Sequence, residues 1–64
     1  MTTGRKIRAR RESLGLTQIE ASAKCRPPMS QPAWSDYEAG HVSPSVEQLR
    51  RIAAALECKA ADLV

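Results

Sequence analysis

Residues 16–40 read LTQIEASAKCRPPMSQPAWSDYEAG, and this stretch decides the fold because it carries the signals of two short, consecutive helices. Thr17 is a favourable N-cap residue. Glu20, three residues later, can accept a hydrogen bond from the Thr17 backbone N–H and so complete a capping box. The pattern predicts a first helix of this pair from Gln18 to about Cys25.

The second helix of the pair has its own start and stop signals. Ser30 is an N-cap candidate, and Pro32 falls in the first helical turn, where its missing N–H costs little. Gly40 can end the helix because glycine enters the left-handed C′ conformation without strain. Between the two helices, Arg26-Pro27-Pro28 must break the helix, because two prolines remove two donors and restrict the residue before them. We therefore predict a helix over residues 31–39.

Helices this short are unstable alone, so the flanking segments must support them. Strong helix formers without proline predict a helix from Arg5 to Leu14, ended by Gly15, whereas residues 1–4 have no pattern and are expected to fray.

A further helix is predicted from its cap and its apolar spacing. Ser45 and Gln48 form a second capping box. Apolar residues then follow at helical spacing, with Arg51 among the residues expected to face water. The stripe consists of Val46, Leu49, Ile52, Ala53 and Leu56. A last short turn is expected over residues 60–63.

Length and composition restrict the class. Sixty-four residues allow a single domain over 1–64, and no alternating β-branched run predicts a strand. The fold class is therefore all-α, a bundle of about five short helices. No apolar run is long enough for a membrane span, and we expect a cytoplasmic protein. Cys25, Cys58 and His41 are too few for a convincing metal site, and no cofactor or small-molecule ligand is evident.

The charge distribution suggests a polyanionic partner. The net charge is +3, but seven Lys or Arg against two acidic residues precede Met29, and three against five follow Pro28. Five of the basic residues fall in the first predicted helix, where they suit either a polyanion or a solvated helix face. They are Arg5, Lys6, Arg8, Arg10 and Arg11.

The aromatic residues are expected in the core. Trp34 and Tyr37 are spaced i and i+3, which is typical of an inward stripe, with base stacking as the weaker alternative. The first helix of the pair carries only small residues on one face, Ala21, Ser22 and Cys25, which would permit close helix approach.

Three groups of residues together resemble the lambda-repressor/Cro-like (Xre-type) helix-turn-helix family. They are Ile7, Arg11-Glu12 and Gly15-Leu16-Thr17-Gln18; then Ser30-Gln31, Trp34-Ser35, Tyr37-Glu38 and Gly40; then Pro44-Ser45, Leu49, Ile52-Ala53 and Leu56. The resemblance implies a five-helix bundle that presents its third helix to the DNA major groove. It covers nearly the whole chain.

The resemblance implies a role for each matching position. The base-reading set is Gln31, Pro32, Ala33, Ser35 and Asp36. Gln31 is the strongest candidate because its amide can pair with both N6 and N7 of adenine. Asp36 could accept from cytosine N4 or could discourage binding to wrong sites. The phosphate-binding set is Gln18, Ser30, His41, Arg5, Lys6, Arg8 and Arg10. Arg11 and Glu38 occupy positions at which the family commonly places an interior ion pair.

Two features depart from the family pattern. The connection from Cys25 to Ser30 is about two residues longer than the usual tight turn, which affects the register of Gln18 relative to Gln31. Ala21 and Ser22 stand where Leu and Ala are usual, so the second helix packs thinly.

The function implied is a sequence-specific DNA-binding regulator, a repressor acting as a homodimer on a palindromic site of double-stranded DNA. The C-terminal Leu63-Val64 and the loop before the fourth helix are candidate dimer surfaces. The alternative is a protein-interaction module that keeps the fold without using DNA. An enzyme is excluded because no nucleophile–base pair or pocket is evident.

Overall fold

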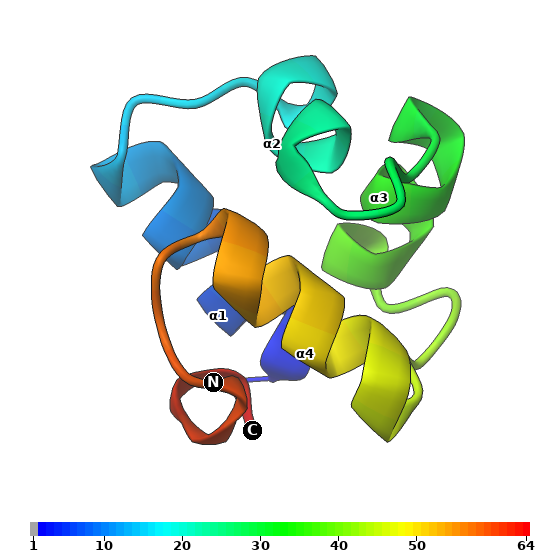
Figure 1. Ribbon diagram of the computed structural model, residues 1–64. Helices are drawn as coiled ribbons and strands as arrows, with labels where there is room; N and C mark the ends of the chain where they lie inside the picture. Colours follow the sequence, from blue (N-terminus) through cyan, green and yellow to red (C-terminus); the bar gives the residue numbers. More distant parts are fainter. Residues whose placement is uncertain (1) are drawn as a thin grey trace.

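The computed structural model describes residues 2–64, which form four α-helices and one 3-10 turn (Figure 1). They are α1 (Thr3–Ser13), α2 (Gln18–Lys24), α3 (Gln31–Ala39), α4 (Val46–Ala55) and η1 (Ala60–Leu63). The all-α prediction is confirmed, although the fifth predicted helix is a single 3-10 turn. Among these residues, no helix is long and apolar enough to cross a membrane.

Helix α1 begins two residues earlier than predicted. The Thr2 hydroxyl accepts a hydrogen bond from the Arg5 backbone N–H at 3.3 Å, so Thr2 is the N-cap. Gly4 is buried against α3. The prediction that residues 1–4 fray is therefore wrong for residues 2–4, because a cap and a packing contact hold them. Met1 lies outside the described residues.

The capping signals of the central pair are confirmed. Thr17 and Glu20 form a reciprocal capping box, with N···O distances of 3.1 and 2.9 Å. The Ser30 hydroxyl caps α3 through the Ala33 backbone N–H. Gly40 ends α3 with a φ of 80°, the left-handed conformation that favours glycine. The local sequence thus determines where α3 begins and where it ends.

The core is built around Trp34, which is fully buried. As predicted, Tyr37 is also buried, and its hydroxyl donates to Gln48 Oε1 on α4. The small residues of α2 are buried too. The core comprises Ile7, Ala21, Cys25, Trp34, Tyr37, Ile52, Ala53, Ala55, Leu56 and Leu63, with Ser22 buried beside them.

Two predictions for α4 are wrong. Val46 is 68% exposed because, as the first helical residue, it lies beyond the end of the core. Arg51 does not simply face water but is half-buried, and its guanidinium donates to the Pro27 carbonyl.

Leu63 is buried, so it cannot contribute to a dimer surface as expected, whereas Val64 is exposed.

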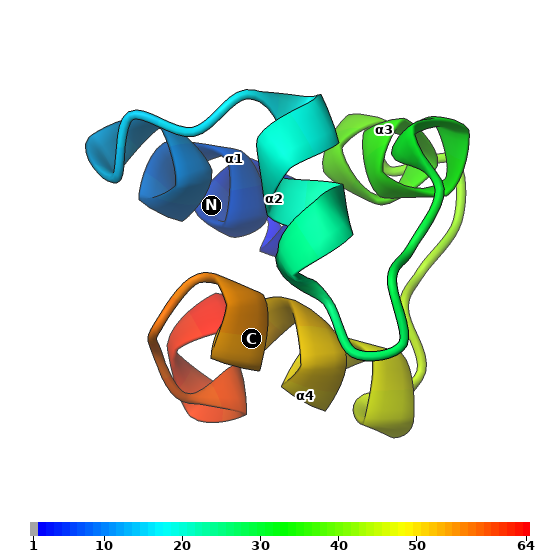
Figure 2. The ribbon, with the colours of Figure 1, turned by 45° about the horizontal axis from the view of Figure 1, so that its top comes forward.

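The longer connection between α2 and α3 is tied down at both sides. It contains a cis peptide bond between Arg26 and Pro27. The Met29 backbone N–H donates to the Ser22 carbonyl on α2, and Arg51 holds the connection from α4. Figure 2 shows this link running from α2 to the surface of α4 before α3 begins. The extra residues are therefore accommodated away from the α2–α3 contact.

A buried ion pair joins α1 to α3. Arg11 donates to both carboxylate oxygens of Glu38, through Nε at 2.6 Å and Nη2 at 3.1 Å. The two side chains are only 12% and 5% exposed. Burial by itself raises the pKa of Glu38, but hydrogen bonds from Arg11, Trp34 and Gln18 and the charge of Arg11 outweigh it. The net pKa of Glu38 is below its usual value of 4.5.

Gly4→Ala is expected to destabilise the protein. A Cβ at this position would lie 2.5 Å from the Glu38 carbonyl oxygen and 2.6 Å from that of Tyr37, so α1 and α3 would have to separate. Overpacking of this kind costs about 1–3 kcal/mol, although alanine is the better helix former. Urea unfolding followed by Trp34 fluorescence measures the change. The control Ala9→Gly, at an exposed position of α1, reports helix propensity alone. A Gly4→Ala variant as stable as the wild type would contradict the close helix contact.

Stability is expected to fall on acidification. Because the folded-state pKa of Glu38 is lowered, its ionised form stabilises the fold above about pH 4.5, and this stabilisation is lost as pH falls through the folded pKa. The free energy of unfolding, measured between pH 7 and pH 2, should therefore decline at the acid end. In the double variant Arg11→Met/Glu38→Gln, which removes both charges together, this part of the decline should disappear.

Glu20→Gln is the matched control for the acid decline. The pKa of Glu20 is also lowered, by hydrogen bonds from Thr17, but Glu20 is exposed and lies outside the ion pair. The part of the acid decline that comes from Glu38 should survive this substitution. An equal acid decline in the double variant would show that Glu38 is not its source.

Candidate nucleic-acid interface

A chain of hydrogen bonds runs from the buried ion pair to the surface of α3. Gln18, the first residue of α2, donates from Nε2 to Glu38 Oε1 at 3.1 Å. Gln31, the first residue of α3, donates from Nε2 to Gln18 Oε1 at 2.7 Å. Both glutamines are half-buried. Despite the longer connection, the structure therefore brings together the starts of α2 and α3.

The base-reading residues predicted on α3 differ in exposure. Pro32 and Asp36 are exposed, whereas Gln31, Ala33 and Ser35 are half-buried. Ser35 lies in a hollow between α1, α2 and α3 that is lined by Arg8, Arg11, Gln18, Ser35, Glu38 and Ala39. Of the five residues expected to contact DNA bases, two are thus exposed to solvent and three are partly covered by neighbouring residues.

Ser30 and His41 lie at opposite ends of α3. The Ser30 hydroxyl accepts from the Ala33 backbone, which leaves its own O–H free to donate to an anion. His41 is exposed, and its Nδ1 lies 3.7 Å from Asp36 Oδ1, a weak pairing at the surface. The His41 backbone N–H also donates to the Asp36 carbonyl. Asp36 therefore has the His41 side chain beside it, just after the end of α3.

Two arginines of α1 lie beside this surface. Arg8 shares the hollow with Gln18 and Ser35, and its side chain is 64% exposed. Within residues 2–64 its one ion-pair partner is Glu12, one turn along α1, at 3.3 Å. Arg5 is exposed in a neighbouring hollow near the end of α3. Exposed i,i+4 pairs contribute little, so Arg8 remains free to bind an anion.

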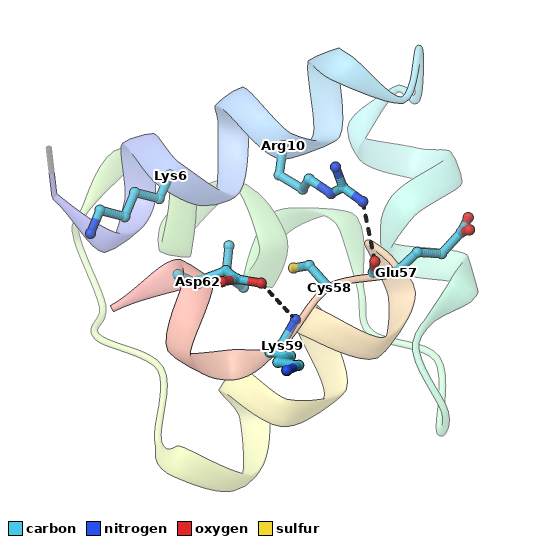
Figure 3. Close-up of a pocket in the computed structure, with 7 residues that line it drawn as sticks. Lys6, Arg10, Glu57, Cys58, Lys59 and Asp62 are labelled. Carbon is cyan, nitrogen blue, oxygen red and sulfur yellow. Dashed lines mark hydrogen bonds between the residues drawn. The ribbon is translucent and has the colours of Figure 1, made fainter.

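Lys6 and Arg10 do not join the other predicted phosphate ligands. Arg10 donates to the carbonyls of Leu56 and Glu57 at 3.0 and 3.1 Å, and Lys6 donates to the Val64 carbonyl. Figure 3 shows Arg10 reaching from α1 to the backbone after α4. Because a helix turns 100° per residue, these side chains emerge on the η1 side of α1. Lys6 and Arg10 therefore lie in a different hollow from Arg8.

Two interactions at this site were missed by sequence reasoning. The Trp34 indole N–H donates to Glu38, a contact that the i,i+4 spacing on α3 could have indicated. The bond from Gln18 to Glu38 had no local signal, because it depends on how α2 packs across α3. Together with Arg11, these donors make Glu38 the meeting point of three helices.

The cysteines offer no competing chemistry at this surface. Burial raises the pKa of both the Cys25 and the Cys58 thiol, so both stay protonated near neutral pH. Residues 2–64 contain no group of three or more His, Cys, Asp or Glu placed to hold a metal ion. The interface instead offers amide groups beside arginines, a combination that suits base edges and phosphates.

Comparisons with known proteins agree with this geometry. Residues 7–63 match the family model described as helix-turn-helix. No curated protein sequence matches the chain. Among solved structures, the chain is similar to the P22 c2 repressor protein in a crystal structure with synthetic operator 9T. The two share 30% sequence identity and a TM-score of 0.88, over 100% of this chain and 94% of that one. The chain therefore belongs to the Cro/C1-type helix-turn-helix family of DNA-binding regulators.

Proposed function

We propose that the protein is a repressor that binds a palindromic operator in double-stranded DNA as a homodimer, with α3 in the major groove. The observation that carries the proposal is the hydrogen-bonded pair Gln18–Gln31, which fixes a base-reading amide at the start of α3. The similar P22 c2 repressor was solved with a synthetic operator, which supports the same class of ligand.

Gln31 is suited to adenine in the conformation it already holds. One Nε2 hydrogen is used by Gln18, while the second hydrogen and Oε1 remain available. Adenine presents the N7 acceptor and the N6 donor in the major groove, which match this remaining pair. Gln18 keeps one free Nε2 hydrogen that can donate to a phosphate beside the same base pair.

The electrostatic contribution is assigned to Arg5 and Arg8 from α1, with Ser30 and His41 at the two ends of α3. Arginine–phosphate contacts release counterions and fix the register of the protein on the duplex. A single module offers a small interface, and two-fold pairing doubles the base contacts. Val42 and Val46, on the loop before α4 and at its start, are exposed apolar residues available for such a contact.

A random-sequence DNA pool, selected and sequenced at two salt concentrations, tests the proposal. Enrichment of a palindrome with half-sites about one helical turn, or roughly 10 base pairs, apart is expected. An enriched site without two-fold symmetry would contradict the homodimer. Absence of binding at both salt concentrations would contradict DNA recognition and leave the protein-interaction alternative.

Gln31→Ala is expected to weaken binding to the selected operator by about 1–3 kcal/mol, because a bidentate base contact is lost. The loss should be confined to one position of each half-site. Fluorescence anisotropy on the operator and on duplexes substituted at that position measures it. If Gln31→Ala lost equal affinity for every duplex, the residue would not read a base.

Arg8→Ala is expected to weaken binding to all sequences and to flatten the salt dependence. Each lost phosphate contact should reduce the slope of log affinity against log salt by about 0.9. Lys6→Ala is the matched control, because Lys6 lies on the η1 side of α1 and should leave the slope unchanged. Equal slope changes in the two variants would show that the face of α1 beside α3 has no special role.

A further inference from the structure

The carboxylate of Glu38 accepts more hydrogen bonds than its ion pair with Arg11 supplies. It accepts hydrogen bonds from three side chains: Arg11, Gln18 and the indole of Trp34. Two of these donors, the guanidinium and the indole, have no acceptor atom and cannot reverse their hydrogen bonds. Gln18 is the exception, since a primary amide has a donor end and an acceptor end.

Glu38 determines which end of Gln18 faces inward. An ionised carboxylate only accepts, so Gln18 must present Nε2 to it, as observed at 3.1 Å. The Gln18 Oε1 then faces Gln31, which must in turn present its own Nε2, as observed at 2.7 Å. The direction of each hydrogen bond is therefore set by the one before it, beginning at a side chain only 5% exposed.

We propose that Glu38 is a specificity-determining residue that acts through Gln18 to fix the orientation of the Gln31 amide and thereby selects adenine over guanine. The inference rests on the proposed function. In the fixed orientation, Gln31 offers DNA one acceptor and one donor. Guanine presents two acceptors, N7 and O6, in the major groove, so Gln31 Oε1 would meet O6 without a hydrogen between them.

Glu38→Gln should reverse the chain of hydrogen bonds. The amide oxygen introduced at position 38 is needed where Arg11 Nε and Trp34 both donate. The new NH2 then takes the place of Oε1, where it faces Gln18 and where Arg11 Nη2 loses its acceptor. Gln18 must then turn its Oε1 inward and its Nε2 toward Gln31. Gln31 would accept through Oε1 and present both Nε2 hydrogens to DNA, an arrangement that suits the two acceptors of guanine.

The test is the ratio of affinities for two operator duplexes that differ only by adenine or guanine at the position read by Gln31. The ratio should fall at least about fivefold in Glu38→Gln, the lower end of what a bidentate base contact contributes. Glu47→Gln, the same chemical change at an exposed residue of α4, should keep the wild-type ratio. An unchanged ratio in folded Glu38→Gln would overturn the proposal.

A second variant keeps the proposal testable if Glu38→Gln does not fold. Glu38→Gln leaves the buried Arg11 charge without its partner, which is destabilising. Arg11→Met/Glu38→Gln removes both charges and retains Trp34 as the donor that holds the amide oxygen, so the same fall in the ratio is expected. A wild-type ratio in this double variant would also overturn the proposal.

A measurement without DNA separates this proposal from the proposed function. In the free ¹⁵N-labelled protein, the side-chain amide resonances of both Gln18 and Gln31 should shift in Arg11→Met/Glu38→Gln, but not in Glu47→Gln. A shift at Gln18 alone would show that Glu38 does not act beyond its immediate neighbour. If both resonances shift in a protein that selects no DNA, the proposed function fails while the hydrogen-bond chain stands.

Discussion

The structure depends on one buried carboxylate. Glu38 of α3 binds Arg11 of α1, Gln18 of α2 and Trp34 of its own helix, so a single group fixes the relative positions of three helices. Burying a charge in a chain of 64 residues is costly unless all of its hydrogen bonds are made. The hydrogen bonds that Glu38 accepts from Arg11, Trp34 and Gln18 meet that condition. They also explain why the pKa of Glu38 is lowered despite burial.

The same arrangement connects the core to the proposed DNA-binding surface. Gln18 is half-buried and Gln31 lies at the start of α3, so the polar path leads outward without an isolated polar group. The α2–α3 connection could have disturbed this path, but its additional residues pack toward α4, where Arg51 holds Pro27. Gln18 and Gln31 are therefore in contact even though the connection between α2 and α3 is longer than the usual turn.

Much of the fold was predictable because its signals are local. Thr17, Ser30, Ser45 and Gly40 act on their own helix ends, and each appears where expected. The start of α1 was not predicted, because the burial of Gly4 depends on contact with α3. At the site, four positively charged residues of α1 looked alike in sequence, and only contacts with the chain from Leu56 onward separate Lys6 and Arg10 from Arg5 and Arg8. The direction of the glutamine hydrogen bonds likewise required three helices to be in place.

The most direct test of the account is titration of the ¹⁵N-labelled protein with its selected operator duplex. Both backbone and side-chain amide resonances should be followed. The largest changes are expected at the Gln18 and Gln31 side chains and along the exposed face of α3, with little change in η1. Changes concentrated at η1 or on the α4 surface around Arg51, with the two glutamines unaffected, would contradict it.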